Sequence, residues 1–279
     1  MSTELVRNVS DTARWVATYR ARESARKDAL FDDPLAARLA SERGHAIADA
    51  ASKHSEWAII TRTKLIDDLV LETARGGSER LLDLAAGFDT RPYRLALPPT
   101  FRWIEADLPA LVAEKEELLR GETPHCVLER HAVDLSDTTA RTRFLAESTA
   151  GASNVTVMTE GLVMYLDESV VASLARDFLA TPAISAWILD FNSPRIRAEM
   201  MDQMAKTLNN APLRFAPENG VAFWEALGWK PRVVKSLFHE AARLKRLPLW
   251  MRPFALLPQP DVRSLGDERW TGVVRFERA

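Results

Sequence analysis

The stretch LLDLAAGFDTRPYRL, residues Leu81 to Leu95, decides the fold of this 279-residue chain. Its first four residues are typical of a buried strand, and Gly87 stands where the backbone has to turn sharply. A dinucleotide site at such a turn carries three glycines in the pattern G-x-G-x-x-G, whereas the six positions here read A-A-G-F-D-T. Asp89 would also place a carboxylate where a phosphate normally meets a helix N-terminus. The turn therefore disfavours a pyrophosphate ligand.

Strand-like and helix-like segments alternate from this stretch onward, which indicates a parallel sheet with helices on both faces. We expect strands at 80–84, 101–107, 125–134, 154–160 and 183–191, and helices at about 91–96, 109–120, 138–148 and 168–180. Upstream the chain is helical, and its last helix there runs roughly from Ser55 to Arg75. Downstream, 232–238 and 271–277 are two further strand candidates. The segment LPLWMRPFALLPQP (247–260) between them predicts a packed loop, and its apolar residues are a candidate interface.

Composition is that of an ordinary globular protein, with 47% hydrophobic residues and a formal net charge of −2. This balance gives no reason to expect nucleic acid or an acidic membrane as partner. A single cysteine, Cys126, excludes an intrachain disulfide, and no signal peptide or long apolar run is present. We expect a cytoplasmic protein with one domain over 1–279, made of a helical region (1–77), a cofactor-binding core (78–191), a lid insertion (192–220) and C-terminal strands (221–279).

Acidic residues end every expected strand from the second to the fifth. In an open α/β sheet, ligands bind at these carboxyl ends. Asp107 lies 20 residues after Gly87, which is the spacing at which an acid accepts both ribose hydroxyls of an adenine nucleoside. This spacing suits NAD and other adenosyl ligands alike. The missing glycines favour a ligand without pyrophosphate, such as the sulfonium S-adenosylmethionine.

Arg62 is placed inside an apolar helical face, because Ile59, Ile66, Leu69 and Val70 share its stripe on a helical wheel. Arginine is rarely buried without a partner, since an unpaired buried charge is strongly destabilising. One interpretation is that it extends to solvent or pairs with a carboxylate of the fold. The other is that its guanidinium binds a ligand carboxylate in bidentate fashion, such as that of the methionyl end of S-adenosylmethionine.

Six segments, in this order, resemble the successive motifs of the leucine carboxyl methyltransferase family. The likeness is greatest to its bacterial branch of S-adenosylmethionine-dependent methyltransferases, which are related to polyketide O-methyltransferases. The segments span roughly residues 11–170 and read TARWVATYRARESARKDALFDDPLA, TRTKLIDDLV, LLDLAAGFDTRPYRL, WIEADLPALVAEK, AVDLSD and EGLVMYL. The resemblance implies a doubly wound, Rossmann-like class I methyltransferase sheet of the α/β class. That sheet is mostly parallel with an antiparallel edge strand, and an N-terminal helical region accompanies it.

The resemblance also implies S-adenosyl-L-methionine as cofactor and a role for individual residues. It assigns Arg62 to the cofactor carboxylate, Gly87 to the methionyl moiety, Asp107 to the ribose, Asp134 and Leu135 to the adenine, and Glu160 to the methionyl ammonium. Tyr165 is a candidate positioning residue, no catalytic residue is assigned, and no metal is expected. The family's usual G-A-G-x-D-T-R appears here as A-A-G-F-D-T-R, so that Ala85 replaces a glycine.

The reaction we expect is O-methylation of a carboxylate on a small molecule or natural-product intermediate. Such an acceptor is already ionised at neutral pH and needs no general base. A phenol or alcohol would need one, and the candidates are Tyr19, His45, His54 and His239. The alternatives are an NAD-dependent oxidoreductase and a catalytically inactive binding protein with the methyltransferase fold.

Overall fold

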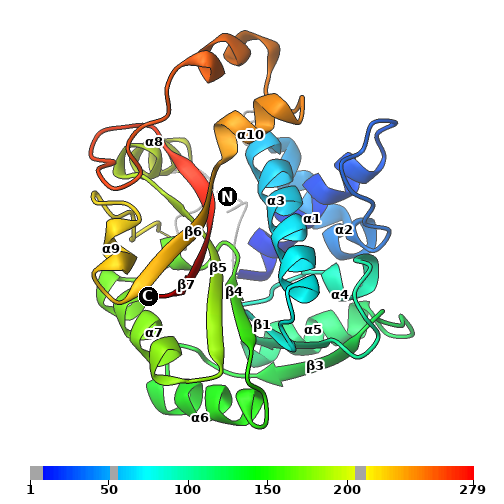
Figure 1. The fold of residues 1–279 in the computed structure, drawn as a ribbon. Helices are drawn as coiled ribbons and strands as arrows, with labels where there is room; N and C mark the ends of the chain where they lie inside the picture. Colours follow the sequence, from blue (N-terminus) through cyan, green and yellow to red (C-terminus); the bar gives the residue numbers. More distant parts are fainter. Residues whose placement is uncertain (1–8, 51–55, 205–211) are drawn as a thin grey trace, which may run out of the picture.

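The computed structural model describes residues 9–50, 56–204 and 212–279 and contains a seven-stranded sheet flanked by helices (Figure 1). The strand order across the sheet is β3-β2-β1-β4-β5-β7-β6. The strands are β1 (Arg80–Leu84), β2 (Arg102–Asp107), β3 (Val127–Ala132), β4 (Val155–Thr159), β5 (Ile184–Asn192), β6 (Trp229–Ser236) and β7 (Thr271–Arg278).

The first five strands pair in parallel, and β7 is antiparallel to both of its neighbours, β5 and β6. The expected sheet, mostly parallel with antiparallel pairing at one edge, is thus confirmed. The chain proceeds outward from β1 through β2 to β3 and then returns to place β4 on the other side of β1. This reversal makes the carboxyl ends of β1 and β4 the switch point at which a ligand site forms.

Helices cover both faces of the sheet, as the alternating pattern predicts (Figure 1). Helix α3 packs on one face, where Leu81 and Trp103 lie, and α6 and α7 pack on the other, where Leu82 and Trp187 lie. Successive residues of β1 therefore enter opposite cores, because side chains alternate across a strand. The α-helices are α1 (Val9–Ser24), α2 (Ala36–Ala50), α3 (Glu56–Arg75), α4 (Arg91–Arg94), α5 (Pro109–Leu118), α6 (Thr138–Thr149), α7 (Glu168–Ala180), α8 (Pro194–Met204), α9 (Ala222–Glu225) and α10 (Leu237–Arg243).

In the C-terminal part, one expected strand is confirmed with shifted bounds and one expectation is wrong. The strand predicted at 232–238 is β6, which ends at Ser236, and α10 begins at Leu237. The proline-rich segment is not packed, since it forms the short 3-10 helix η2 (Leu249–Leu256), in which no residue is buried. Prolines lack the backbone N–H donors that a longer α-helix needs, and this explains why the segment forms a short 3-10 helix instead. None of the helices in the described ranges is long and apolar enough to cross a bilayer.

Candidate functional site

The turn after β1 uses two residues in the left-handed backbone region. Ala85 has a φ of +58° and Gly87 a φ of +47°, and the amide of Ala85 donates to the carbonyl of Ala106 at 2.8 Å. This conformation suits glycine and costs about 1–2 kcal/mol for a residue with a Cβ atom. The alanine at the family's first glycine position is therefore a conformational cost as well as an added methyl group.

Asp107 and Gly87, which the sequence assigns to the same ligand, are in direct contact. The Oδ2 atom of Asp107 accepts the amide of Gly87 at 2.7 Å, and Oδ1 accepts the amide of Leu108 at 2.7 Å. Burial raises the pKa of the Asp107 carboxyl, although these two amide hydrogen bonds act to lower it. Each oxygen has a second lone pair that remains available to a hydroxyl donor. The carboxylate thus anchors the turn and can still accept ligand hydrogen bonds.

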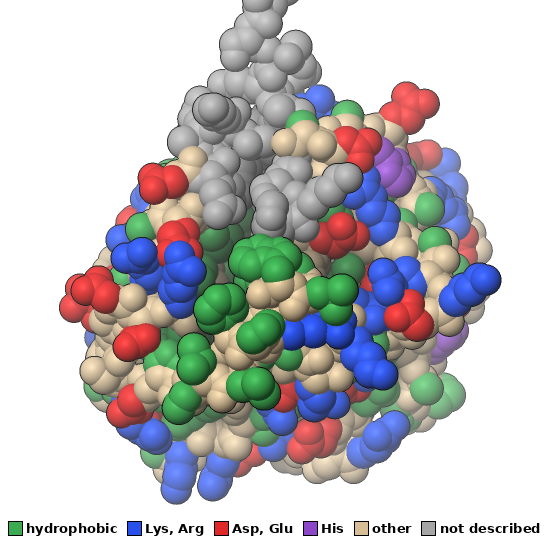
Figure 2. Space-filling view, turned by 90° about the horizontal axis from the view of Figure 1, so that it is seen from above, with side chains coloured by type: hydrophobic (Ala, Val, Ile, Leu, Met, Phe, Trp, Pro, Cys, Tyr) green, Lys and Arg blue, Asp and Glu red, His purple; other side chains and the backbone are tan. Residues whose placement is uncertain are grey.

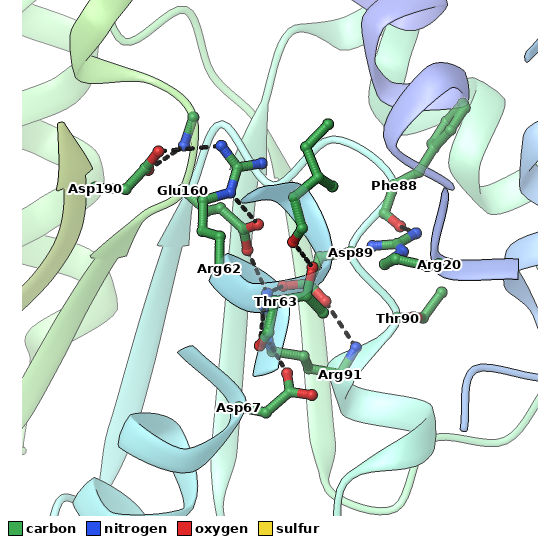
Figure 3. Close-up of polar contacts among 12 residues, drawn as sticks. Arg20, Arg62, Thr63, Asp67, Phe88, Asp89, Thr90, Arg91, Glu160 and Asp190 are labelled. Atoms are coloured by element: carbon green, nitrogen blue, oxygen red, sulfur yellow. Dashed lines mark hydrogen bonds and ion pairs between the residues drawn. The ribbon is translucent and has the colours of Figure 1, made fainter. Parts of the chain in front are cut away.

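Arg62 lies across the carboxyl ends of β4 and β5 and pairs with an acid from each (Figure 3). Its Nε atom donates to Oε1 of Glu160 at 2.9 Å, and Nη1 donates to Oδ2 of Asp190 at 3.0 Å. Gly161 allows this approach, because a Cβ atom there would lie 3.3 Å from Nη1. Pairing with carboxylates of the fold is therefore what Arg62 does in this structure. No hydrogen bond from its Nη2 atom is formed with a residue of the described ranges.

A second arginine, Arg91 of α4, holds the other side of Glu160. Its Nη1 atom lies 2.8 Å from Oε2 of Glu160, and its Nε atom donates to Oδ1 of Asp67 at 2.7 Å. Arg91 also pairs with Asp89, and its side chain is only 1% exposed (Figure 3). Sequence reasoning missed both Arg91 and Asp67. Asp67 is buried on α3 but lies beside the apolar stripe that contains Arg62 and not inside it, so the helical wheel gave no signal for it.

The charges of this cluster decide its protonation. Burial acts to raise the pKa of Glu160, but Arg91 and Arg62 outweigh it and hold the pKa below its ordinary value. Burial raises the pKa of Asp190, and the nearby charge of Arg62 offsets this rise only in part. Burial also opposes ionisation of Asp89, yet Arg91 lowers the pKa of that carboxyl. The charge of Asp89 is thus balanced within the fold by Arg91, so Asp89 is not a free carboxylate at the turn.

The residues assigned to the adenine lie beyond the end of β3. Asp134 is exposed, and its Oδ1 atom accepts the amide of Ser136 at 2.9 Å and its hydroxyl at 2.7 Å. These hydrogen bonds lower the pKa of Asp134. Leu135 is half-buried, and the amide of Val133 donates to the carbonyl of Asp107 at 2.9 Å. The segment is therefore joined to the ribose candidate through the backbone.

Two further polar side chains lie on the β5 side of the site. Tyr165 of η1 (Val163–Tyr165) has its pKa raised by burial, so that the phenol stays protonated. Asn192 ends β5 and is 5% exposed, and its Nδ2 atom meets the sulfur of Met200 at 3.6 Å and that of Met164 at 3.9 Å. Thioether sulfur is a weak acceptor, so the amide retains hydrogen-bonding capacity.

Three of the four proposed general bases do not lie in this cluster. His45 is exposed on α2, Tyr19 is buried on α1, and the ring of His239 contacts the Ser236 hydroxyl and the Leu257 carbonyl. His54 lies outside the described residues. Within the described ranges, no group of three or more histidine, cysteine or acidic side chains could hold a metal ion.

Of the lid expected at 192–220, the structure describes residues 192–204 and 212–220. Helix α8 forms the first part, and residues 205–211 lie outside the described ranges. Beyond them, the amides of Arg214 and Phe215 donate to the carbonyl of Met164 at 2.8 and 3.2 Å. This second part therefore crosses η1, next to Tyr165.

Comparisons with known proteins agree on the family. The family model described as leucine carboxyl methyltransferase matches residues 13–178. A relative from Frankia alni, named "Putative S-adenosyl-L-methionine-dependent methyltransferase", is 31% identical over 267 residues, which cover 88% of this chain and 93% of the relative. One from Streptomyces coelicolor with the same name is 36% identical over 175 residues, covering 58% of this chain and 62% of that protein.

Two solved structures share the fold over almost the whole chain. A DUF574 family protein from Streptomyces avermitilis has a TM-score of 0.58 at 15% identity, and covers 96% of this chain and 97% of its own. A methyltransferase candidate from Thermobifida fusca has a TM-score of 0.56 at 16% identity, with 96% and 94% covered. At these identities the likeness concerns the fold alone.

Proposed function

Because the chain belongs to the leucine carboxyl methyltransferase family, we propose that it methylates a carboxylate oxygen of a small molecule or natural-product intermediate. It is an S-adenosyl-L-methionine-dependent methyltransferase, and the bound cofactor supplies an electrophilic methyl group on a positive sulfur. The family description, which names a carboxyl acceptor, supports the proposal. Neither an NAD-dependent oxidoreductase nor an inactive binding protein is favoured by any feature of the site.

The residues at the switch point fit the cofactor in charge and hydrogen-bonding capacity. Among the described residues, a Cβ atom at Gly87 would meet only the Cβ of Ala13, at 3.6 Å, so they leave the backbone of the turn accessible. Asp107 has lone pairs for the ribose hydroxyls, and the ionised Glu160, which is 16% exposed, can accept from the methionyl ammonium. The Nη2 atom of Arg62 can donate to the cofactor carboxylate. We assign the adenine to Asp134 and Leu135, as the resemblance implies.

The observation that carries the choice of acceptor is the absence of a free base in the described part of the site. Glu160 is held by two arginines, and Asp190 accepts from Arg62 and from the amide of Gly161 at 2.6 Å. Tyr165 stays protonated and can donate a hydrogen bond but not remove a proton. An acceptor that is already ionised suits such a site. The protein then acts by holding the two reacting atoms together and by excluding water.

The test has two stages. Calorimetric titration with S-adenosylmethionine, S-adenosylhomocysteine and NAD should give saturable binding of both adenosyl compounds and none of NAD. Methyl transfer from tritiated cofactor to a panel of carboxylic acids and phenols then identifies the acceptor. A methyl ester releases tritiated methanol in alkali, whereas a methyl ether does not. Products that all resist alkali would refute carboxylate methylation and leave the cofactor assignment intact.

A further inference from the structure

The segment between β6 and β7 carries the largest group of exposed apolar side chains in the described ranges. Five of them, which we call the η2 patch, lie on or directly after η2. They are Leu249, Trp250, Phe254, Leu256 and Leu257, with exposures of 75%, 63%, 56%, 88% and 61%. Figure 1 shows that this segment projects beyond the rest of the molecule, above α10. From their size and exposure the five present on the order of 600 Å² of apolar surface, at the upper end for a protein that binds nothing there.

The charged residues within the stretch that carries the η2 patch are basic, and the acids Glu240 and Asp261 flank this stretch. Residues 241–260 contain four cations, Arg243, Lys245, Arg246 and Arg252, and no aspartate or glutamate. Arg246 is neutralised by Glu23, at 2.7 Å, and Arg243 by Glu240, at 2.6 Å. Lys245 and Arg252 have no acidic partner in the described part of the chain, and Figure 2 shows basic side chains beside the apolar ones on this face.

A second copy of the chain fits this surface poorly. A stable complex buries about 800 Å² on each partner, which exceeds the area of the patch. A two-fold contact centred on the patch would also add the Lys245 and Arg252 of a second copy to a surface that already carries this pair of cations. Residues 241–260 themselves hold no acid that could compensate them.

We propose that the η2 patch binds the surface of an anionic lipid bilayer. Leucine and aromatic side chains enter the boundary between headgroups and acyl chains, and neighbouring lysine and arginine side chains pair with lipid phosphates. The overall charge of −2 does not oppose this binding, since attraction to a membrane acts locally and fades within about 10 Å. The expectation from composition that no membrane is a partner considered the chain as a whole and not this segment.

The topology fixes which end of the protein would face the bilayer. Gly272 of β7 pairs with Phe191 at the carboxyl end of β5 and with Ser236 at the end of β6. The segment that connects β6 to β7 therefore leaves the sheet at the end where Glu160 and Asp190 lie. A bilayer bound to the η2 patch would lie on the side of the sheet that holds the candidate site.

Co-sedimentation of the full-length protein with vesicles tests the proposal. We expect the protein to bind equimolar phosphatidylcholine–phosphatidylglycerol vesicles and to bind pure phosphatidylcholine at least tenfold more weakly. The variant Leu249→Ser/Leu256→Ser/Leu257→Ser should lower the partition coefficient at least tenfold, whereas the control Val127→Ser, at a position 44% exposed on β3, should not change it. Lys245→Gln/Arg252→Gln should weaken binding to anionic vesicles only, and Arg143→Gln on α6 is its control.

A second readout locates the contact. Brominated phospholipid should quench part of the tryptophan fluorescence of the wild type, and Trp250→Phe should remove that part while vesicle binding persists. Equal binding of the wild type and the triple serine variant to anionic vesicles would overturn the proposal. So would a dimer in sedimentation velocity that the triple variant abolishes, because the patch would then be an interface between copies. Neither result would affect the cofactor assignment.

Discussion

The turn at Ala85 yields the sharpest prediction, because one substitution removes one conformational cost. Ala85→Gly places glycine where φ is +58°. The left-handed conformation costs alanine about 1–2 kcal/mol, and glycine pays almost none of it. Glycine also has more conformational freedom than alanine in the unfolded chain, and this lowers the free energy of unfolding by about 0.4–1 kcal/mol. We therefore expect the variant to be more stable by about 1 kcal/mol, or about 2 °C in Tm for a chain of this size.

Urea unfolding in the absence of cofactor measures this difference, because a bound ligand would add its own stabilisation. The matched control is Ala86→Gly. Ala86 is adjacent in the same turn and 8% exposed, but it does not have a positive φ. There glycine only loses the methyl contact and gains unfolded-state freedom, so we expect a loss of about 1 kcal/mol.

An Ala85→Gly variant that is less stable than the wild type would refute this reasoning. It would mean that packing of the Ala85 methyl group outweighs the backbone cost. The same variant bears on the cofactor, since it restores the family's glycine. Its affinity for S-adenosylhomocysteine should equal or exceed that of the wild type.

Four further predictions concern the charged and polar residues of the site. Asp107→Asn should weaken S-adenosylhomocysteine binding about tenfold to a hundredfold in calorimetry, because two charge-assisted hydrogen bonds are lost; unchanged affinity would remove Asp107 from the site. Since the folded pKa of Asp107 is raised, cofactor affinity of the wild type should fall with acid already above the ordinary pKa range of aspartate, and Asp107→Asn should lack this dependence. Glu160→Gln should cost about 3 kcal/mol of stability at neutral pH. The folded pKa of Glu160 is lowered, so this contribution is present above the unfolded pKa and is lost as pH falls through the folded one; a stability difference that stays constant into acid would contradict it. Arg62→Met should cost about 3–5 kcal/mol in urea unfolding, because Glu160 and Asp190 lose their shared cation, and Arg62→Lys should recover part of that loss; full stability with lost cofactor binding would show that Arg62 serves the ligand alone. Among the described residues, Asn192 contacts only thioether sulfurs through Nδ2, so we expect this amide to bind the acceptor; Asn192→Leu should then raise the KM of the acceptor and leave S-adenosylhomocysteine affinity unchanged, and an equal loss of both would place Asn192 on the cofactor side instead.

The sequence by itself determined the α/β fold class and indicated individual residues of the candidate site. Alternating apolar periods are local, so β1 to β5 and the helices between them could be recognised from short windows. The spacing of 20 residues between Gly87 and Asp107 was informative because a βαβ unit has a nearly fixed length. An arginine inside an apolar stripe likewise indicated that Arg62 faces inward, which the structure confirms at 13% side-chain exposure.

Only the tertiary structure decided how the charges of the site pair. Arg62 meets acids that lie 98 and 128 residues away, and Arg91 meets Asp67 across 24 residues. No sequence window contains such pairs, because the energy of a buried ion pair depends on distance and desolvation, which the fold alone sets. For the same reason Asp89 read as a free carboxylate in the sequence and is bound to Arg91 in the fold. The strain at Ala85 is also tertiary, because its φ follows from where β1 ends and where Asp107 holds the turn.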